Sequence, residues 1–242
     1  MDQHRDNRIG LPEVVPERQK LPYPNYTRSE RLADAVVHVI GVASALVAVT
    51  VLFWLFSEHM GWGTFLAVTI YAGAMVLMLV ASAAYHMAAH TTLRPVLRRI
   101  DHAAIYLKIA GSFTPLAILL GTGFGYMVLG LVWLVALIGA AAKLMAKRGN
   151  MTTGWAPQVA LGWVGLLLVV PLWAVLPPSS FWFIIGGGML YTSAVIFYCW
   201  DSLRYANAIW HACVLVATGC MFWGISTALA AALVAAPQIA LN

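Results

Sequence analysis

Residues 64–88 read TFLAVTIYAGAMVLMLVASAAYHMA and contain no Asp, Glu, Lys or Arg. An apolar run of ~20 residues is long enough to cross a bilayer as one α-helix. The stretch therefore predicts a membrane-spanning helix, and its last two turns carry the polar side chains of Ser82 and His86.

Six similar stretches flank this one, and together they predict an all-α integral membrane protein built as a seven-helix bundle. The chain has 242 residues, of which 62% are hydrophobic and 10% charged, whereas soluble domains are about half apolar and a quarter charged. Seven spans of ~20 residues leave about 100 residues for a tail and connections, which excludes a soluble catalytic domain. The expected spans are 33–56, 64–88, 102–121, 124–144, 157–177, 180–199 and 206–234.

The same pattern divides the chain into three parts. We expect a polar N-terminal tail over 1–32, a membrane domain over 33–236 and a short C-terminal tail over 237–242. The N-terminal tail is rich in proline and has no apolar core of a secretory signal.

The basic residues alternate along the predicted bundle. All but one of the 14 Lys and Arg residues lie in the N-terminal tail, in the second, fourth and sixth connections or at their borders. Because cytoplasmic segments are enriched in basic residues, we expect a cytoplasmic N-terminus and an external C-terminus. The net charge of +5 is then a topology signal, so membrane lipids and not nucleic acid are the expected partners. The exception, Lys108, lies inside the third span.

This orientation is opposite to that of a G-protein-coupled receptor. A microbial rhodopsin is disfavoured as well, because the last span has no lysine for a Schiff base.

Polar side chains gather near the expected cytoplasmic ends of four spans. Ionisable groups inside a bilayer are costly and mark functional sites. Spacings of four residues place such side chains on one helix face. The candidates are Asp34 and His38 in the first span, Ser82 and His86 in the second, Asp101 in the third, and Asn207 and His211 in the seventh.

Imidazoles from separate helices are typical zinc ligands, and a catalytic zinc keeps one position open for water. Asp101 could hold that water or orient an imidazole, and the Ser82 hydroxyl could support an oxyanion. The alternative is structural: His86 and His211 could form interhelical hydrogen bonds, and Asp101 could be a favourable charge at a helix N-terminus. Both interpretations remain open at this point.

Lys108 is separated from Asp101 by seven residues and from Ser112 by four, so the three share one stripe of the third span. The stripe could line a polar cavity, or the lysine could extend towards the membrane surface.

Four motifs together resemble the bacterial haemolysin III family, within the progestin and adipoQ receptor superfamily, from Glu30 to about Phe222. They are Glu30-Arg-Leu-Ala-Asp34-Ala-Val-Val-His38, Ser82-Ala-Ala-Tyr-His86, Asp101-His-Ala-Ala-Ile-Tyr with Ala110-Gly-Ser-Phe-Thr-Pro115, and Asn207-Ala-Ile-Trp-His211.

The resemblance implies a zinc site near the cytoplasmic face, with His86 and His211 as ligands. Asp101 matches the family residue that reaches the metal through water, and Ser82 matches the serine near that site. The third family ligand is a histidine where this chain has Asn207, and a neutral amide oxygen is a poor zinc donor.

Another residue must therefore replace the missing imidazole if zinc is bound. Asp101 could bind the ion directly, or His38 could replace the ligand if its helix lies close. The opening motif also differs, because Asp34 stands where the family often has Asn. His38, Asp34 and Lys108 are therefore second-tier candidates.

The resemblance extends to distant seven-helix ceramidase-type hydrolases. The leading hypothesis is a zinc-dependent hydrolase of a lipid amide or ester in the bacterial inner membrane, with Asp101 and Ser82 as catalytic residues. The second is a non-enzymatic sensor or receptor-like protein with a structural metal site. The third is a haemolytic pore, and the sequence identifies no protein partner.

Overall fold

The computed structural model of the chain describes residues 26–88, 91–146, 154–200 and 202–239. Within these ranges the chain is helical and contains no strand. The helices are α1 (Arg28–Phe56), the short 3₁₀ helix η1 (Ser57–His59), α2 (Trp62–Met87), α3 (Arg94–Leu120), α4 (Gly123–Met145), α5 (Ala156–Trp163), α6 (Leu166–Val175), α7 (Pro178–Tyr198) and α8 (Ala206–Ile239).

The described residues contain 7 helical spans that are long and apolar enough to cross a membrane. The α5–α6 pair counts as one of them, Ala156–Val175. The prediction of an all-α, seven-span bundle is therefore confirmed. Most of the N-terminal tail, the basic residues Lys147 and Arg148, and residues 240–242 lie outside the described ranges.

The fifth span differs from the uninterrupted helix expected over 157–177. The backbone N–H groups of Val164 and Gly165 bond carbonyls three residues earlier, Leu161 and Gly162. Such bonds tighten the turn between α5 and α6. Gly165 also lies against the ring of Phe113, where an added Cβ would come within 3.3 Å.

Two helices begin at least a full turn earlier than the hydrophobic pattern indicated. α1 begins at Arg28 instead of residue 33, and α3 begins at Arg94 instead of residue 102. The extension of α3 contacts α4, because Arg99 donates to the carbonyls of Leu144 and Ala146, each at 3.4 Å. Asp101 is consequently an internal residue of α3, so its interpretation as a charge at a helix N-terminus is wrong.

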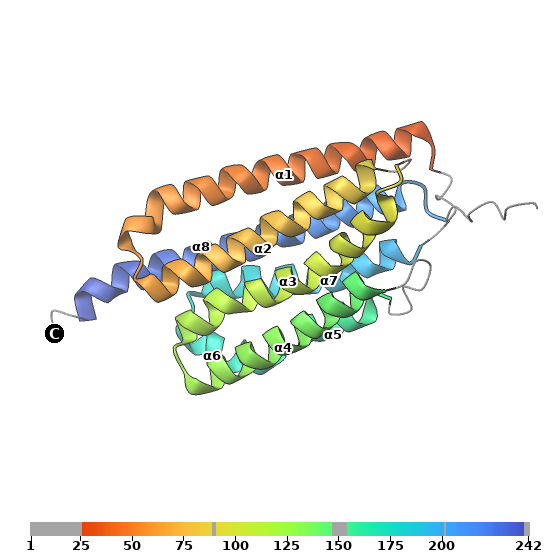
Figure 1. Cartoon of the computed structure of the whole chain (residues 1–242). Helices are drawn as coiled ribbons and strands as arrows, with labels where there is room; N and C mark the ends of the chain where they lie inside the picture. The colour runs from red at the N-terminus through yellow and green to blue at the C-terminus, as the bar shows by residue number, and fades with distance from the viewer. Residues whose placement is uncertain (1–25, 89–90, 147–153, 201, 240–242) are drawn as a thin grey trace, which may run out of the picture.

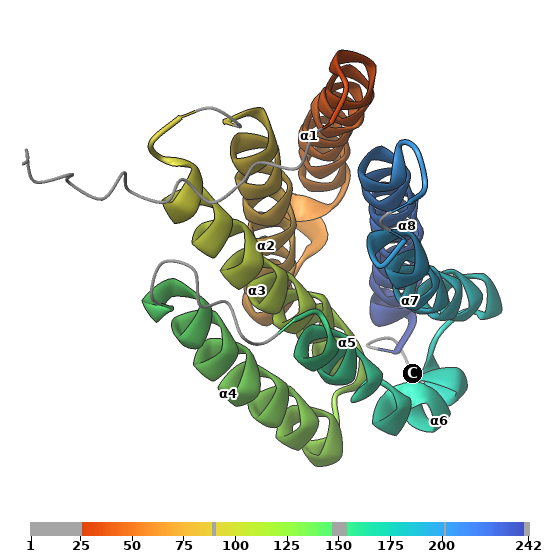
Figure 2. The same cartoon turned by 90° about the vertical axis from the view of Figure 1, so that its right-hand side faces the viewer.

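α3 is the central helix of the bundle (Figures 1 and 2). In its most apolar window 72% of residues are buried, against 17% for α1. α3 packs on α2, α4, α5, α6 and α8, whereas α1 lies at the edge against α2 and α8. Gly111 permits close packing of α3 on α2, since an added Cβ would lie 2.8 Å from the Cβ of Ala74. Small residues at helix contacts are typical of membrane bundles.

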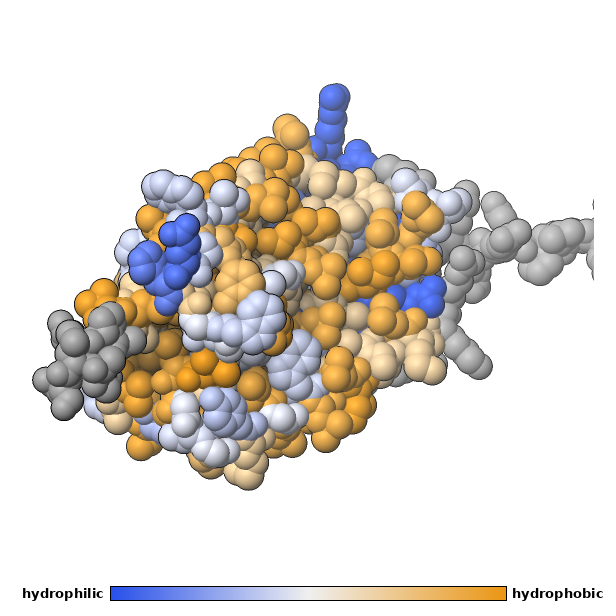
Figure 3. Space-filling model, turned by 60° about the vertical axis from the view of Figure 1, so that its left-hand side comes forward, coloured by the Kyte–Doolittle hydropathy of each residue, from blue (hydrophilic) through white to orange (hydrophobic). Residues whose placement is uncertain are grey.

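The outer surface is hydrophobic, as Figure 3 shows for one face of the molecule. Large apolar side chains such as Trp54 and Val170 are 80% and 78% exposed. Such exposure would favour aggregation in water and suits a lipid environment. The start of α1 and the end of α8 lie at opposite ends of the bundle (Figure 1), as an odd number of spans requires.

Candidate metal centre

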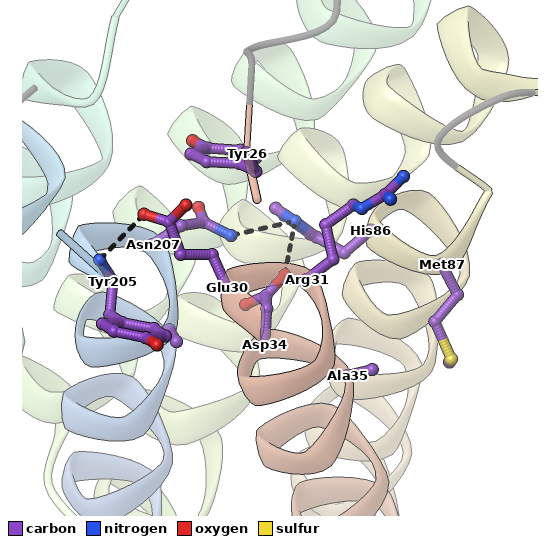
Figure 4. Close-up of a pocket in the computed structure, with 10 residues that line it drawn as sticks. Tyr26, Glu30, Arg31, Asp34, Ala35, His86, Met87, Tyr205 and Asn207 are labelled. Carbon is purple, nitrogen blue, oxygen red and sulfur yellow. Dashed lines mark hydrogen bonds and ion pairs between the residues drawn. The ribbon is translucent and has the colours of Figure 1, made fainter. Parts of the chain in front are cut away.

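The first turn of α1 connects this edge helix to the rest of the bundle. Thr27 and Glu30 form a capping box, in which the Glu30 carboxylate accepts from the backbone N–H of Thr27 at 2.8 Å. The other Glu30 oxygen accepts from the backbone N–H of Tyr205 at 3.1 Å (Figure 4). Tyr205 immediately precedes α8 and has a φ of 63°, which is uncommon outside glycine. Glu30 therefore holds the starts of α1 and α8 together.

One turn beyond Glu30, four side chains from three helices converge. Asp34 and His38 come from α1, His86 from the end of α2 and His211 from the second turn of α8. One ligand atom from each of the four lies within 4.8 Å of all the others. We call these four residues the metal centre, because this arrangement could hold a metal ion.

The Asp34 carboxylate bridges two imidazoles. Its Oδ1 lies 2.8 Å from Nδ1 of His211, and its Oδ2 lies 3.2 Å from Nδ1 of His86. A carboxylate only accepts hydrogen bonds, so Nδ1 of His211 carries the hydrogen. Nε2 of a neutral His211 is then free of a proton, which is the state a metal ligand requires.

His38 is oriented by its own helix. Its Nδ1 lies 2.7 Å from the backbone carbonyl of Asp34 and must donate to it. Its Nε2 lies 3.2 Å from the Ser82 hydroxyl on α2. The three rings are in mutual contact, with centroids 5.0 Å apart for His38 and His86 and 4.4 Å apart for the other two pairs.

These donors fit a divalent metal. Three imidazoles and one carboxylate form a ligand set that zinc and other transition metals use. Zinc–nitrogen bonds of about 2.0–2.1 Å place tetrahedral ligand atoms about 3.4 Å apart, and the four ligand atoms here lie within 4.8 Å of one another. The set also includes an anion, which offsets part of the charge of a bound cation.

The remaining sequence candidates lie beside the metal centre. Asn207 on α8 places its Nδ2 3.3 Å from Nδ1 of His86, so it contacts a ligand of the group without joining it (Figure 4). Asp101 on α3 is buried and interacts with the Ser82 hydroxyl. The structure thus brings together every candidate except Lys108, which lies two turns further along α3.

Two second-tier candidates from the sequence, Asp34 and His38, belong to this group, and each contacts more of its members than Asp101 does. Their spacing of four residues was the available signal. What the spacing could not show is that Glu30 holds the first turn of α1 against the residue before α8.

Two cavities meet at the metal centre. The smaller one, of about 270 Å³, is lined by the polar side chains of Glu30, Arg31, Asp34, His86 and Asn207 together with apolar ones such as Met87 (Figure 4). We call it the vestibule. A larger one of about 480 Å³ extends between the helices and is mostly apolar. We call it the inner cavity.

His86 and Asn207 line both cavities. The residues Ser82, Asp101 and His211 line the inner cavity. Members of the metal centre therefore line both a cavity that holds charged side chains of α1 and a larger, mostly apolar cavity.

The fold and this centre define a multi-pass membrane protein with a partly buried histidine–carboxylate group near one end of its bundle. The sequence profile of the family described as "Haemolysin-III related" matches residues 26–222. The chain therefore belongs to the haemolysin III family, as its motifs predicted.

Two curated relatives agree with this assignment. The chain is 32% identical over 200 residues to the "Hemolysin-3 homolog" of Bacillus subtilis (strain 168), a match that covers 82% of this chain and 93% of the relative. It is 31% identical over 195 residues to "Hemolysin-3" of Bacillus cereus, which covers 80% and 89%.

Proposed function

We propose that this protein is a zinc-dependent intramembrane hydrolase that cleaves a lipid amide or ester. The observation that carries the proposal is the position of the metal centre between the vestibule and the inner cavity. Hydrolysis of a lipid needs water and an apolar substrate at the same atoms, and a cavity with charged side chains beside a mostly apolar one would supply both.

Zinc is the proposed ion because its protein ligands are mainly imidazole, thiolate and carboxylate, and the metal centre offers three imidazoles and a carboxylate. His86 and His211 would hold it, as the family resemblance implies. His38 and Asp34 would replace the family histidine that is Asn207 here, since both lie within the same group of ligand atoms. When bound, zinc supplies Lewis acidity that activates water and polarises an acyl carbonyl.

The chain's own residues then have distinct tasks. Asp101 would orient a water molecule and accept its proton, because its carboxylate lies in the inner cavity beside Ser82. The Ser82 hydroxyl would donate to the oxygen on which negative charge develops. Asn207 would hold the His86 ring in place.

We further propose that the protein spans the bacterial inner membrane and that the metal centre lies near its cytoplasmic side. Arg28 and Arg31 begin α1, Arg94 begins α3 and Arg204 precedes α8, all at the end of the bundle that carries the centre (Figure 1). Basic residues favour the cytoplasmic side.

The first experiment measures the metal content of the full chain purified in detergent. We expect near-stoichiometric zinc in the wild type, loss in His211→Ala, and retention in His59→Ala, an exposed histidine at the opposite end of the bundle. Asn207→His adds an imidazole beside His86 and is expected to bind zinc more tightly. Zinc in Asn207→His but none in the wild type would contradict the proposed role of Asp34 and His38.

The second experiment measures turnover of fluorogenic fatty-acyl amides and esters. Asp101→Ala is expected to abolish turnover while keeping zinc content and melting temperature. Unchanged turnover in this variant would contradict the catalytic assignment of Asp101.

One observation favours a second candidate, a membrane sensor in which the metal is a structural clamp. α1 lies at the edge of the bundle, and the metal centre ties it to α2 and α8. A zinc-bound protein that hydrolyses none of these lipids, and whose melting temperature falls on chelation, would favour the sensor over the hydrolase.

A further inference from the structure

Lys108 is a buried cation that the proposed hydrolysis does not use. It lies in the middle of α3, its residue is 6% exposed, and it lines the inner cavity. Among the described residues, none with a carboxylate lies within ion-pair distance of its Nζ. A charge buried in a membrane bundle without a counter-ion is costly and indicates function.

The hydrogen bonds around Lys108 determine which groups donate. The Thr218 hydroxyl has one hydrogen and donates it to the backbone carbonyl of Val214 at 2.8 Å. Thr218 must therefore accept from the Tyr191 hydroxyl, which lies 2.6 Å away. With its hydrogen directed at Thr218, the Tyr191 oxygen accepts from Nζ of Lys108.

This series of hydrogen bonds leaves N–H groups of the Lys108 ammonium without an acceptor. A protonated lysine carries three N–H groups and no acceptor, and Tyr191 takes one of them. The Tyr191 ring also contacts the ammonium, with Nζ 3.9 Å from the ring centroid. Both contacts stabilise a positive charge and orient it, but neither neutralises it.

The rest of the inner cavity indicates the kind of anion. Most of its lining is apolar and includes Phe113, Leu116, Leu172 and Phe181. A small hydrated anion would leave this part of the cavity unfilled, whereas an anion with an apolar body would occupy both parts.

We propose that Lys108 and Tyr191 form a binding subsite for the carboxylate of an amphipathic carboxylic acid whose apolar chain occupies the inner cavity. The subsite is separate from the metal centre. Lys108 lies seven positions after Asp101, which is beside the metal centre, and this offset corresponds to about 10 Å along α3. The proposal therefore does not depend on bound zinc or on hydrolysis.

The test measures binding of tritiated palmitate and tritiated hexadecanol to the detergent-purified full chain treated with EDTA. Chelation removes any contribution of a metal to carboxylate binding. We expect Lys108→Met to weaken palmitate binding at least about tenfold, the scale of a lost charge-assisted hydrogen bond. Hexadecanol binding should stay within about twofold, and Lys108→Arg should retain most of the palmitate affinity.

Controls separate this role from a structural one. Arg204→Met removes an exposed cation near the start of α8 and should leave both ligands unaffected. Because Lys108→Met removes a buried charge without a counter-ion, its melting temperature should equal or exceed that of the wild type.

Equal palmitate binding by the wild type and Lys108→Met would overturn the proposal. So would a parallel loss of both ligands with a lower melting temperature, which would make Lys108 structural. Competition by chloride or inorganic phosphate as strong as that by palmitate would replace the amphipathic acid with a small anion.

Discussion

The metal centre and the Lys108 subsite are both buried polar groups inside one bundle, but they differ in charge balance. In the metal centre Asp34 accepts from His211 and contacts His86, at 2.8 and 3.2 Å. Lys108 has Tyr191 as its side-chain partner, and that partner is neutral. One group holds an anion surrounded by bases, and the other holds a cation with neutral neighbours.

This difference supports the two proposed ligands, which carry opposite charges. Charges inside a bilayer persist when a partner or a function compensates their cost. A carboxylate among neutral imidazoles favours a metal cation. A lysine beside a tyrosine favours an anion, because its spare N–H groups are donors without acceptors.

The two groups share α8 but otherwise depend on different helices. The metal centre needs α1, which lies at the edge of the bundle and is attached by Glu30. The Lys108 subsite joins α3, α7 and α8 in the interior. Changes in one should therefore leave the other intact.

The largest expected effect is the loss of a metal ligand. His86→Ala should lower zinc affinity by more than about 100-fold, beyond the loss typical of an outer-shell residue. Isothermal titration of the apo-protein with zinc measures it, and His59→Ala is the matched control. The comparison fails if zinc affinity is unchanged in His86→Ala, or if palmitate binding falls together with it.

Asp34→Asn tests whether the negative charge of the Asp34 carboxylate contributes to metal binding at the metal centre. It keeps the shape of the side chain and removes its charge, so zinc affinity should fall about 10- to 100-fold. The same titration measures this loss. An unchanged affinity would show that the three histidines bind zinc without the help of this carboxylate.

Tyr191→Phe tests the neutral partner of Lys108. It removes one hydrogen-bond acceptor and keeps the ring, so palmitate affinity should fall about two- to tenfold. Zinc affinity, measured in parallel, is expected to stay at the wild-type value. A larger loss than in Lys108→Met would assign the main binding role to the tyrosine.

The smallest expected effect is a change in melting temperature on loss of an uncharged hydrogen bond between two helices. The buried Ser180 on α7 lies 2.8 Å from the Thr227 hydroxyl on α8. Interhelical hydrogen bonds in membranes contribute about 0.6 kcal/mol on average, so Ser180→Ala should lower the melting temperature by about 2 °C.

Thermal unfolding in detergent measures this shift. The control is Ser193→Ala, an exposed serine that bonds the Met189 carbonyl of its own helix at 2.9 Å. If Ser180→Ala lowered the melting temperature as much as zinc removal does, uncharged polar contacts would matter as much as charged ones. That result would contradict the distinction between functional and structural polar groups.

Much of the fold was predictable because hydrophobicity is a local property of the chain. Seven apolar runs determine seven spans, since each must satisfy its backbone hydrogen bonds within itself. The division of the fifth span into α5 and α6 was harder to predict from the sequence, because its turn at Gly165 also packs against Phe113 of α3. The early start of α3 likewise depends on contacts of Arg99 with α4.

The sequence by itself determined the number of spans, the family motifs and the four-residue spacing that places Asp34 beside His38. Tertiary structure alone decided that these two residues meet His86 and His211, and that Lys108 meets Tyr191. The reason is physical: spacing along one helix follows from its period, whereas contacts between helices depend on which faces pack together. Here the packing of α1 on α2 and α8 brings the four ligand atoms of the metal centre within 4.8 Å of one another.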